Sequence, residues 1–211
     1  MSIEVTEQLR VKLELALNKV VQSLGPIQIG SKEQFPFGWR KAAKGRTVWR
    51  ILEEAITQNL EYNFKNFGFS SVDAASSEVG VYDFSGKFDG IDVPFYVNIK
   101  SAVIGARSNK DDISKAIRLI EFFDQDEERN LFVASFLIKF NDDMSVTVEQ
   151  AIVMPTMWLP DIYVNPSNNG NLQSSKYKYL DQAVRRSNGE FIQALKDEIE
   201  VAKRKRALKA K

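Results

Sequence analysis

The segment NLFVASFLIKF, residues 130–140, is nearly continuous in apolar character. A strand of this composition is typical of a sheet that is buried on both faces, so other layers of structure must cover that sheet from each side. The segment SVTVEQAIVM (145–154) is the next strand-like stretch, and Asn141-Asp142-Asp143 supplies the turn between the two. We therefore expect a central sheet with helices packed against it.

Apolar residues at three- and four-residue steps predict the helices. They are expected over 3–24, ending at Gly25-Pro26; over about Arg46–Phe64; from SNKDD through about Phe123, with Ile113 on the buried stripe and Asn109 or Asp111 as cap; and from about Lys176 or Asn188 to the end. The first helix is expected to pack on its own domain, with a role in dimerisation as the alternative.

Strand-like rhythm marks three short segments, around 79–84, 87–91 and 94–101, whereas 156–175 is expected to be a polar surface loop. The order of elements predicts an α/β fold with a central mixed β-sheet flanked by helices. We expect one domain over 1–211, composed of the N-terminal helix 3–24, a core at about 45–155, and a C-terminal loop and helix at 156–211.

The chain contains no histidine and no cysteine. This excludes a Ser-His-Asp triad, a histidine-based nuclease site, disulfides and thiolate zinc sites. Hydrolytic chemistry would have to use carboxylates, amides, lysine, tyrosine or serine, together with a metal ion bound by oxygen.

Charge is balanced overall, with 29 basic and 28 acidic residues, but it is unevenly distributed. Six basic residues and one acid lie between Lys32 and Arg50, and VAKRKRALKAK (201–211) holds six basic residues and no acid. Local basic segments suit a protein that touches DNA through patches. The N-terminus does not resemble a signal peptide, and no apolar run reaches the ~20 residues of a membrane span, so we expect a cytoplasmic protein.

The segment GKFDGIDVPFYVNIKSA (86–102) concentrates the residues that can carry chemistry. In a strand over 94–101, Phe95, Val97 and Ile99 lie on one face, and Tyr96, Asn98 and Lys100 on the other. A polar group and a lysine side by side are costly to bury without a partner. We expect Asp89 to reach them across the hairpin turn; an Asp-Gly turn and a strand lysine are also common in ordinary hairpins.

This segment resembles the PD-(D/E)XK nuclease superfamily, which includes most Type II restriction endonucleases. The family pattern is an Asp at the start of one strand, then an acid and a lysine separated by one residue on the next. Asp89, Asn98 and Lys100 would fill these places in a restriction-endonuclease-like core. Asn98 departs from the pattern, because it stands where the family has an acid.

An amide oxygen can ligate Mg²⁺, but it is a weaker ligand than a carboxylate. In several branches of the family a Glu on the preceding helix joins the metal site. Glu53 lies on the flank of the apolar stripe and Glu54 nearly opposite it, so Glu53 is the favoured substitute. Asp83 and Asp92 are other possible donors.

The resemblance implies Mg²⁺-dependent phosphodiester hydrolysis. Asp89, Glu53 and the carbonyl of Ile99 would hold the metal, and Lys100 would orient or help deprotonate the attacking water. Contacts with DNA are expected from basic and amide side chains, with a solvated surface as the alternative for each of them. The candidates are Arg40, Lys41, Lys44, Arg46, Asn168, Asn169, Asn171, Gln173 and Lys176.

The function expected from this resemblance is that of a Type II restriction endonuclease acting on double-stranded DNA as a homodimer, within a restriction-modification system. Two identical subunits would read a two-fold symmetric site and cut both strands. The alternatives are a structure-specific or repair nuclease of the same fold, and a non-catalytic DNA-binding module with a decayed site at Asn98.

Overall fold

The computed structural model describes residues 2–40, 45–75, 80–106, 110–167 and 170–209. Helical segments in these ranges are α1 (Ile3–Leu24), α2 (Gly45–Asn63), η2 (Phe64–Phe67), α3 (Ala116–Gln125), η3 (Thr156–Trp158), η4 (Leu180–Gln182) and α4 (Asn188–Lys209). The strands are β1 (Ile27–Gln28), β2 (Phe69–Ala74), β3 (Phe84–Phe88), β4 (Ile91–Val103), β5 (Asp111–Lys115), β6 (Asn130–Phe140), β7 (Ser145–Pro155), β8 (Tyr163–Val164) and β9 (Asn171–Ser174).

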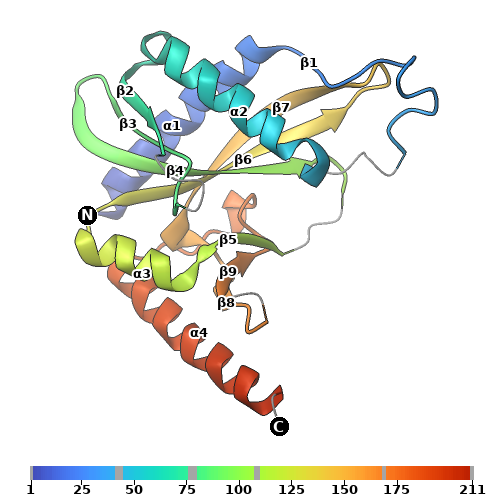
Figure 1. Cartoon of the computed structure of the whole chain (residues 1–211). Helices are drawn as coiled ribbons and strands as arrows, with labels where there is room; N and C mark the ends of the chain where they lie inside the picture. The colour runs from blue at the N-terminus through green and yellow to red at the C-terminus, as the bar shows by residue number, and fades with distance from the viewer. Residues whose placement is uncertain (1, 41–44, 76–79, 107–109, 168–169, 210–211) are drawn as a thin grey trace.

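A mixed sheet with the strand order β1-β7-β6-β4-β3-β2 forms the centre of the molecule (Figure 1). Strands β4 and β6 run parallel, and α3 lies between them in sequence, whereas the other neighbours are antiparallel. A smaller antiparallel sheet has the order β5-β9-β8. The α/β class predicted from the sequence is confirmed.

Two apolar clusters fill the space on the two faces of the large sheet. Helices α1 and α2 cover one face, where Leu13 and Leu52 pack with Val97 and Ile99 of β4. Helices α3 and α4, together with the small sheet, cover the other face, where Leu119, Phe191 and Leu172 join Val133 of β6. The helices lie on opposite sides of the sheet in Figure 1. Strand β6 is buried on both faces, as its apolar run predicts.

The first helix covers the sheet of its own chain, as expected if it packs on its own domain. Its stripe of Leu9, Leu13 and Leu17 is fully buried against β7 and the rest of the first cluster. Ser2 caps the helix by accepting a hydrogen bond from the backbone of Val5, and Gly25 follows its end with a φ of 61°. The stripe is therefore used within this chain.

The third helix begins later than its sequence pattern predicts. Ile113 belongs to β5, which pairs with β9, and α3 starts only at Ala116. Asp111 is therefore a strand residue and does not cap the helix, while Asn109 lies outside the described residues. The reason is tertiary: the backbone of 111–115 finds hydrogen-bond partners in a strand that lies far away in sequence, which local periodicity cannot show.

The hairpin that carries the predicted site is shifted from the expected strand limits. Its first strand spans 84–88 and its second 91–103, so Asp89-Gly90 forms the turn, with Gly90 at a φ of 73°. The expected loop at 156–175 is also partly wrong, because β8 and β9 lie within it and form most of the small sheet. Pairing with β5 supplies the backbone partners that make these polar residues strands.

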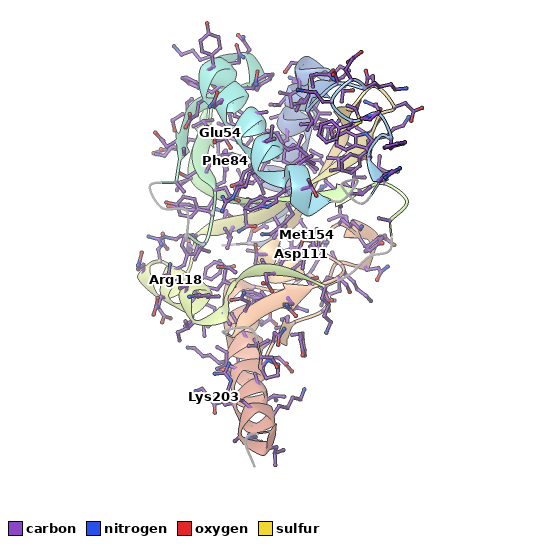
Figure 2. All side chains as sticks on the ribbon, turned by 45° about the vertical axis from the view of Figure 1, so that its right-hand side comes forward. Glu54, Phe84, Asp111, Arg118, Met154 and Lys203 are labelled. Atoms are coloured by element: carbon purple, nitrogen blue, oxygen red, sulfur yellow. The ribbon has the colours of Figure 1, made fainter. Side chains whose placement is uncertain are left out.

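The last helix extends away from both sheets. Phe191, Ile192 and Leu195 bury its first turns, while its charged C-terminal part projects outward with Lys203 on its surface (Figure 2). Of the two starting points predicted for this helix, Asn188 is correct. In the ranges that the structure describes, no helix has the length and apolar character needed to cross a membrane.

Candidate functional site at the start of strand β3

Asp83 stands directly before β3 and is bound to the middle of β4. Its backbone N–H donates to the carbonyl of Val97 at 2.7 Å, and its Oδ2 accepts from the N–H of Ile99 at 2.5 Å. The side chain thereby continues the hydrogen-bonding pattern of the strand that it precedes. Asp83 is thus fixed beside β4, next to the residues just before Lys100.

Glu53 approaches Asp83 from helix α2. Its neighbours Leu52 and Ile56 are buried, which turns the flank of the helix that bears Glu53 toward the sheet. The Glu53 side chain is only 17% exposed, and Asp83 is near enough to raise the pKa of Glu53. Its Oε2 is buried and has no hydrogen-bond partner among the described residues.

Lys100 supplies the positive charge at this place. It follows Ile99 on β4, and its charge acts on both carboxyl groups, lowering the pKa of Glu53 and that of Asp83. Ile99, the residue before Lys100, directs its N–H toward Asp83. Because the N–H and C=O of one strand residue point toward the same neighbouring strand, the Ile99 carbonyl also faces the side where Asp83 lies.

Burial dominates the electrostatics of the two acids. Desolvation and the nearby Asp83 charge raise the pKa of Glu53 to about 7, against the opposing charges of Arg50 and Lys100. Desolvation also raises the pKa of Asp83, against the opposing effects of the Ile99 hydrogen bond and Lys100. The site therefore holds two poorly solvated carboxyl groups, and the nearby positive charges do not fully offset the cost of their desolvation.

Glu53→Gln is expected to stabilise the protein at pH 8 and to change little at pH 5. The folded state holds the Glu53 proton up to about pH 7, whereas the unfolded chain releases it near 4.5, so the free energy of unfolding falls as pH rises across this window. Removing the charge should raise that free energy by about 1–3 kcal/mol at pH 8.

Urea unfolding at both pH values, in the presence of EDTA, measures this effect. Glu54→Gln is the matched control, since Glu54 lies on the exposed side of the same helix, and its effect should stay within about 0.5 kcal/mol. An equal response of the two variants would show that Glu53 carries no such penalty.

Asn98 is buried and has a structural role. Its Nδ2 donates to the carbonyls of Val81, at 3.1 Å, and Ile113, at 3.2 Å. The amide thus ties β4 to the segment that leads into Asp83 and to strand β5 of the small sheet. Its Oδ1 is buried without a hydrogen-bond partner in the described ranges.

The structure does not bring Asp89 to Lys100. Asp89 is exposed at the tip of the hairpin, where its N–H donates to Gly68 and its carbonyl accepts from Lys12. Strand β4 runs from Ile91, next to this turn, to Lys100, a distance of about 30 Å at about 3.3 Å per residue. The expected proximity of Asp89 and Lys100 is therefore corrected: register places Asp83, and not Asp89, near the lysine.

The amides predicted to contact DNA are already occupied. Asp112 accepts from Asn171 Nδ2 at 2.9 Å and from Gln173 Nε2 at 2.6 Å, and Asn165 donates to the other end of Gln173. Lys176 is exposed. The network joins β5 to β9 and leaves the two predicted amides with partners inside the protein.

The predicted basic residues are only partly described. The guanidinium of Arg40 stacks over Phe37, with its carbon 4.0 Å from the ring centre, on an exposed part of the loop. Lys41, Lys44, Asn168 and Asn169 lie outside the described residues, as does the side chain of Arg46.

Asp83 is the principal residue that sequence reasoning undervalued. The sequence pattern indicates it only as a further possible donor, although it directly precedes a strand and so fits an "Asp at the start of a strand" better than Asp89 does. The position at which β3 begins, directly after Asp83, identifies this residue. Arg50 was likewise not singled out, although it lies 3.7 Å from Glu53.

The donors gathered here are oxygens. In the described part of the chain, no group of three or more carboxylate, imidazole or thiol residues is placed to hold a metal ion. Two carboxylates and a main-chain carbonyl form the set that this site offers, and such hard oxygen ligands suit Mg²⁺ with water completing its coordination. In comparisons with known proteins, no family model matches the chain, and no curated relative matches it.

Proposed function

We propose that this protein is a metal-dependent nuclease with a site of the PD-(D/E)XK type. Asp83 takes the place of the acid at the start of a strand, Lys100 that of the lysine on the next strand, and Glu53 that of the acid absent at Asn98. The observation that carries the proposal is that two poorly solvated carboxyl groups, Glu53 from α2 and Asp83 from the residue before β3, act on each other's pKa and both experience the charge of Lys100 on β4.

The residues present fit a divalent cation. Glu53 Oε2 is a buried oxygen without a hydrogen-bond partner among the described residues, and burial raises the pKa of both carboxyl groups. Glu53, Asp83 and the Ile99 carbonyl would hold the ion. When bound, Mg²⁺ supplies an acidified water and stabilises negative charge on the scissile phosphate.

The remaining chemistry belongs to side chains of this site. Lys100 would orient the attacking water, and its positive charge offsets the charge that develops on the phosphate. Asp83 is held in place by Ile99, so its carboxylate needs little rearrangement before the reaction. The Asn98 amide joins β4 to Val81 and Ile113 and so supports the strand that bears Lys100.

Within this class, the specific function proposed is that of a Type II restriction endonuclease, cutting both strands of double-stranded DNA as a homodimer. Polar side chains on β9 and the exposed Lys176 lie in a layer next to β5, which Asn98 joins to the site strand. Of these residues, the exposed Lys176 would approach DNA bound at the site.

Incubation of the purified protein with long linear phage DNA and Mg²⁺ tests the proposal, with EDTA as the control. Discrete fragments that depend on Mg²⁺ would support a restriction endonuclease. A smear, or cutting confined to branched DNA, would support a nuclease of the other kind and reject site-specific cleavage. DNA that is bound but remains intact across metals and salts would reject the enzyme and favour a DNA-binding module.

A further inference from the structure

Arg50 occupies the edge of the candidate site. It lies one turn before Glu53 on α2, and its Nη1 is 3.7 Å from Glu53 Oε2. This is too long for a hydrogen bond, so the pair is an ionic contact without a direct bond. Within the described part of the chain, no hydrogen bond from the guanidinium is formed, and the side chain is 58% exposed.

Stacking on Trp49 holds the guanidinium in place in addition to its ionic contact with Glu53. Its carbon lies 3.9 Å from the centre of the Trp49 ring, and the ring is itself partly exposed. A guanidinium over an indole face is a favourable cation–π arrangement that leaves the edge of the guanidinium, with its N–H groups, free for other partners. Arg50 is thus a positioned cation with donors open to solvent.

The surface beside Arg50 is open to solvent. Arg50, Ile51, Glu54, Ala55 and Gln58 line a shallow, largely open region along α2. Glu54 is the acid in this lining, and its Oε1 accepts a hydrogen bond from Gln58 Nε2 at 2.6 Å, which holds that carboxylate toward the next turn of the helix. An anion can therefore reach Arg50 from solvent while the two site carboxylates stay where they are.

We infer that Arg50, stacked on Trp49, binds a backbone phosphate of the nucleic-acid substrate next to the scissile bond; this rests on the proposed nuclease function. The planar guanidinium matches a phosphodiester with two parallel hydrogen bonds. Its position beside Glu53 places the bound phosphate at the margin of the metal-binding carboxylates. Arg50 also balances the charge of Glu53 before substrate arrives.

Fluorescence anisotropy with a labelled DNA duplex in EDTA, over a range of salt concentrations, tests this inference without requiring cleavage. Arg50→Ala should weaken binding about 10- to 100-fold, as expected for charge-assisted hydrogen bonds to one phosphate. It should also reduce the slope of log affinity against log salt by about 1. Arg50→Lys should recover the salt slope but only part of the affinity.

Lys19→Ala is the matched control, since it removes one positive charge from an exposed position on α1 and should change neither the affinity nor the slope. If Arg50→Ala binds like wild type with an unchanged slope, the inference is wrong even where cleavage occurs. Wild-type binding that depends on Arg50 but never leads to cleavage would keep the phosphate contact of Arg50 and reject both the nuclease and the place of that contact next to a scissile bond. Wild-type protein that binds no duplex would overturn both.

Discussion

Asp83→Asn should lower Mg²⁺-dependent DNA cleavage by about 100- to 1,000-fold, which corresponds to about 3–4 kcal/mol of lost transition-state stabilisation. The change removes one of the two carboxylates that would hold the metal. Asparagine has nearly the same size, and its amide oxygen can still accept the hydrogen bond from the Ile99 N–H. The fold should therefore be kept, and circular dichroism and urea unfolding would verify that it is.

Asp89→Asn is the informative comparison for this variant. Asp89 is the acid that the sequence pattern selects, but the structure places it at the exposed hairpin turn. Initial cleavage rates of both variants at equal protein concentration should separate the two positions, with Asp89→Asn within about threefold of wild type, as for a surface change away from the site. A large loss in Asp89→Asn together with an active Asp83→Asn would reverse the assignment.

Asn98→Asp should destabilise the protein by about 3 kcal/mol at pH 8 and should not raise cleavage. The substitution restores the acid of the family pattern, so a purely sequence-based view predicts a gain in activity. In the structure, however, the Asn98 amide donates to two carbonyl oxygens in a buried place. A carboxylate there would lose both hydrogen bonds and face two acceptors as an uncompensated buried charge.

The penalty at position 98 should also depend on pH. A buried carboxylate without a positive partner has a raised pKa, so the variant should recover stability as pH falls and the carboxyl group becomes a donor. Urea unfolding of wild type and Asn98→Asp at pH 5 and pH 8 measures this, with Asn98→Ala as the uncharged control. A variant as stable as wild type, with faster cleavage, would mean that position 98 belongs to the metal site.

The sequence predicts the layers of the fold better than the details of the site. Periodicity identifies α1, α2, β6 and β7, because each has a long, regular apolar pattern that burial in the two clusters satisfies. It misplaces Ile113 and misses β8 and β9, since these short strands exist through pairing with one another and with β5. Local propensity holds no information on such long-range partners.

Some residues of the candidate site could likewise be predicted from local sequence patterns, and others could not. Lys100 and the choice of Glu53 over Glu54 follow from alternation along a strand and from the helical wheel, and the structure places Glu53 beside Asp83, within reach of the Lys100 charge. The choice between Asp83 and Asp89 depends on hairpin register. Each acid adjoins one end of β3, and only the observed pairing of Phe84 with Val97 decides which end lies near Lys100.

The rate of Mg²⁺-dependent cleavage of supercoiled plasmid DNA by wild type and by Lys100→Ala tests the central claim most directly. Lys139→Ala, which removes an exposed lysine from β6, is the control for the loss of one positive charge. We predict that wild type and Lys139→Ala cut the plasmid, that EDTA stops them, and that Lys100→Ala is about 100-fold slower or worse while remaining folded. Equal cutting by Lys100→Ala and wild type would contradict the assignment of this site.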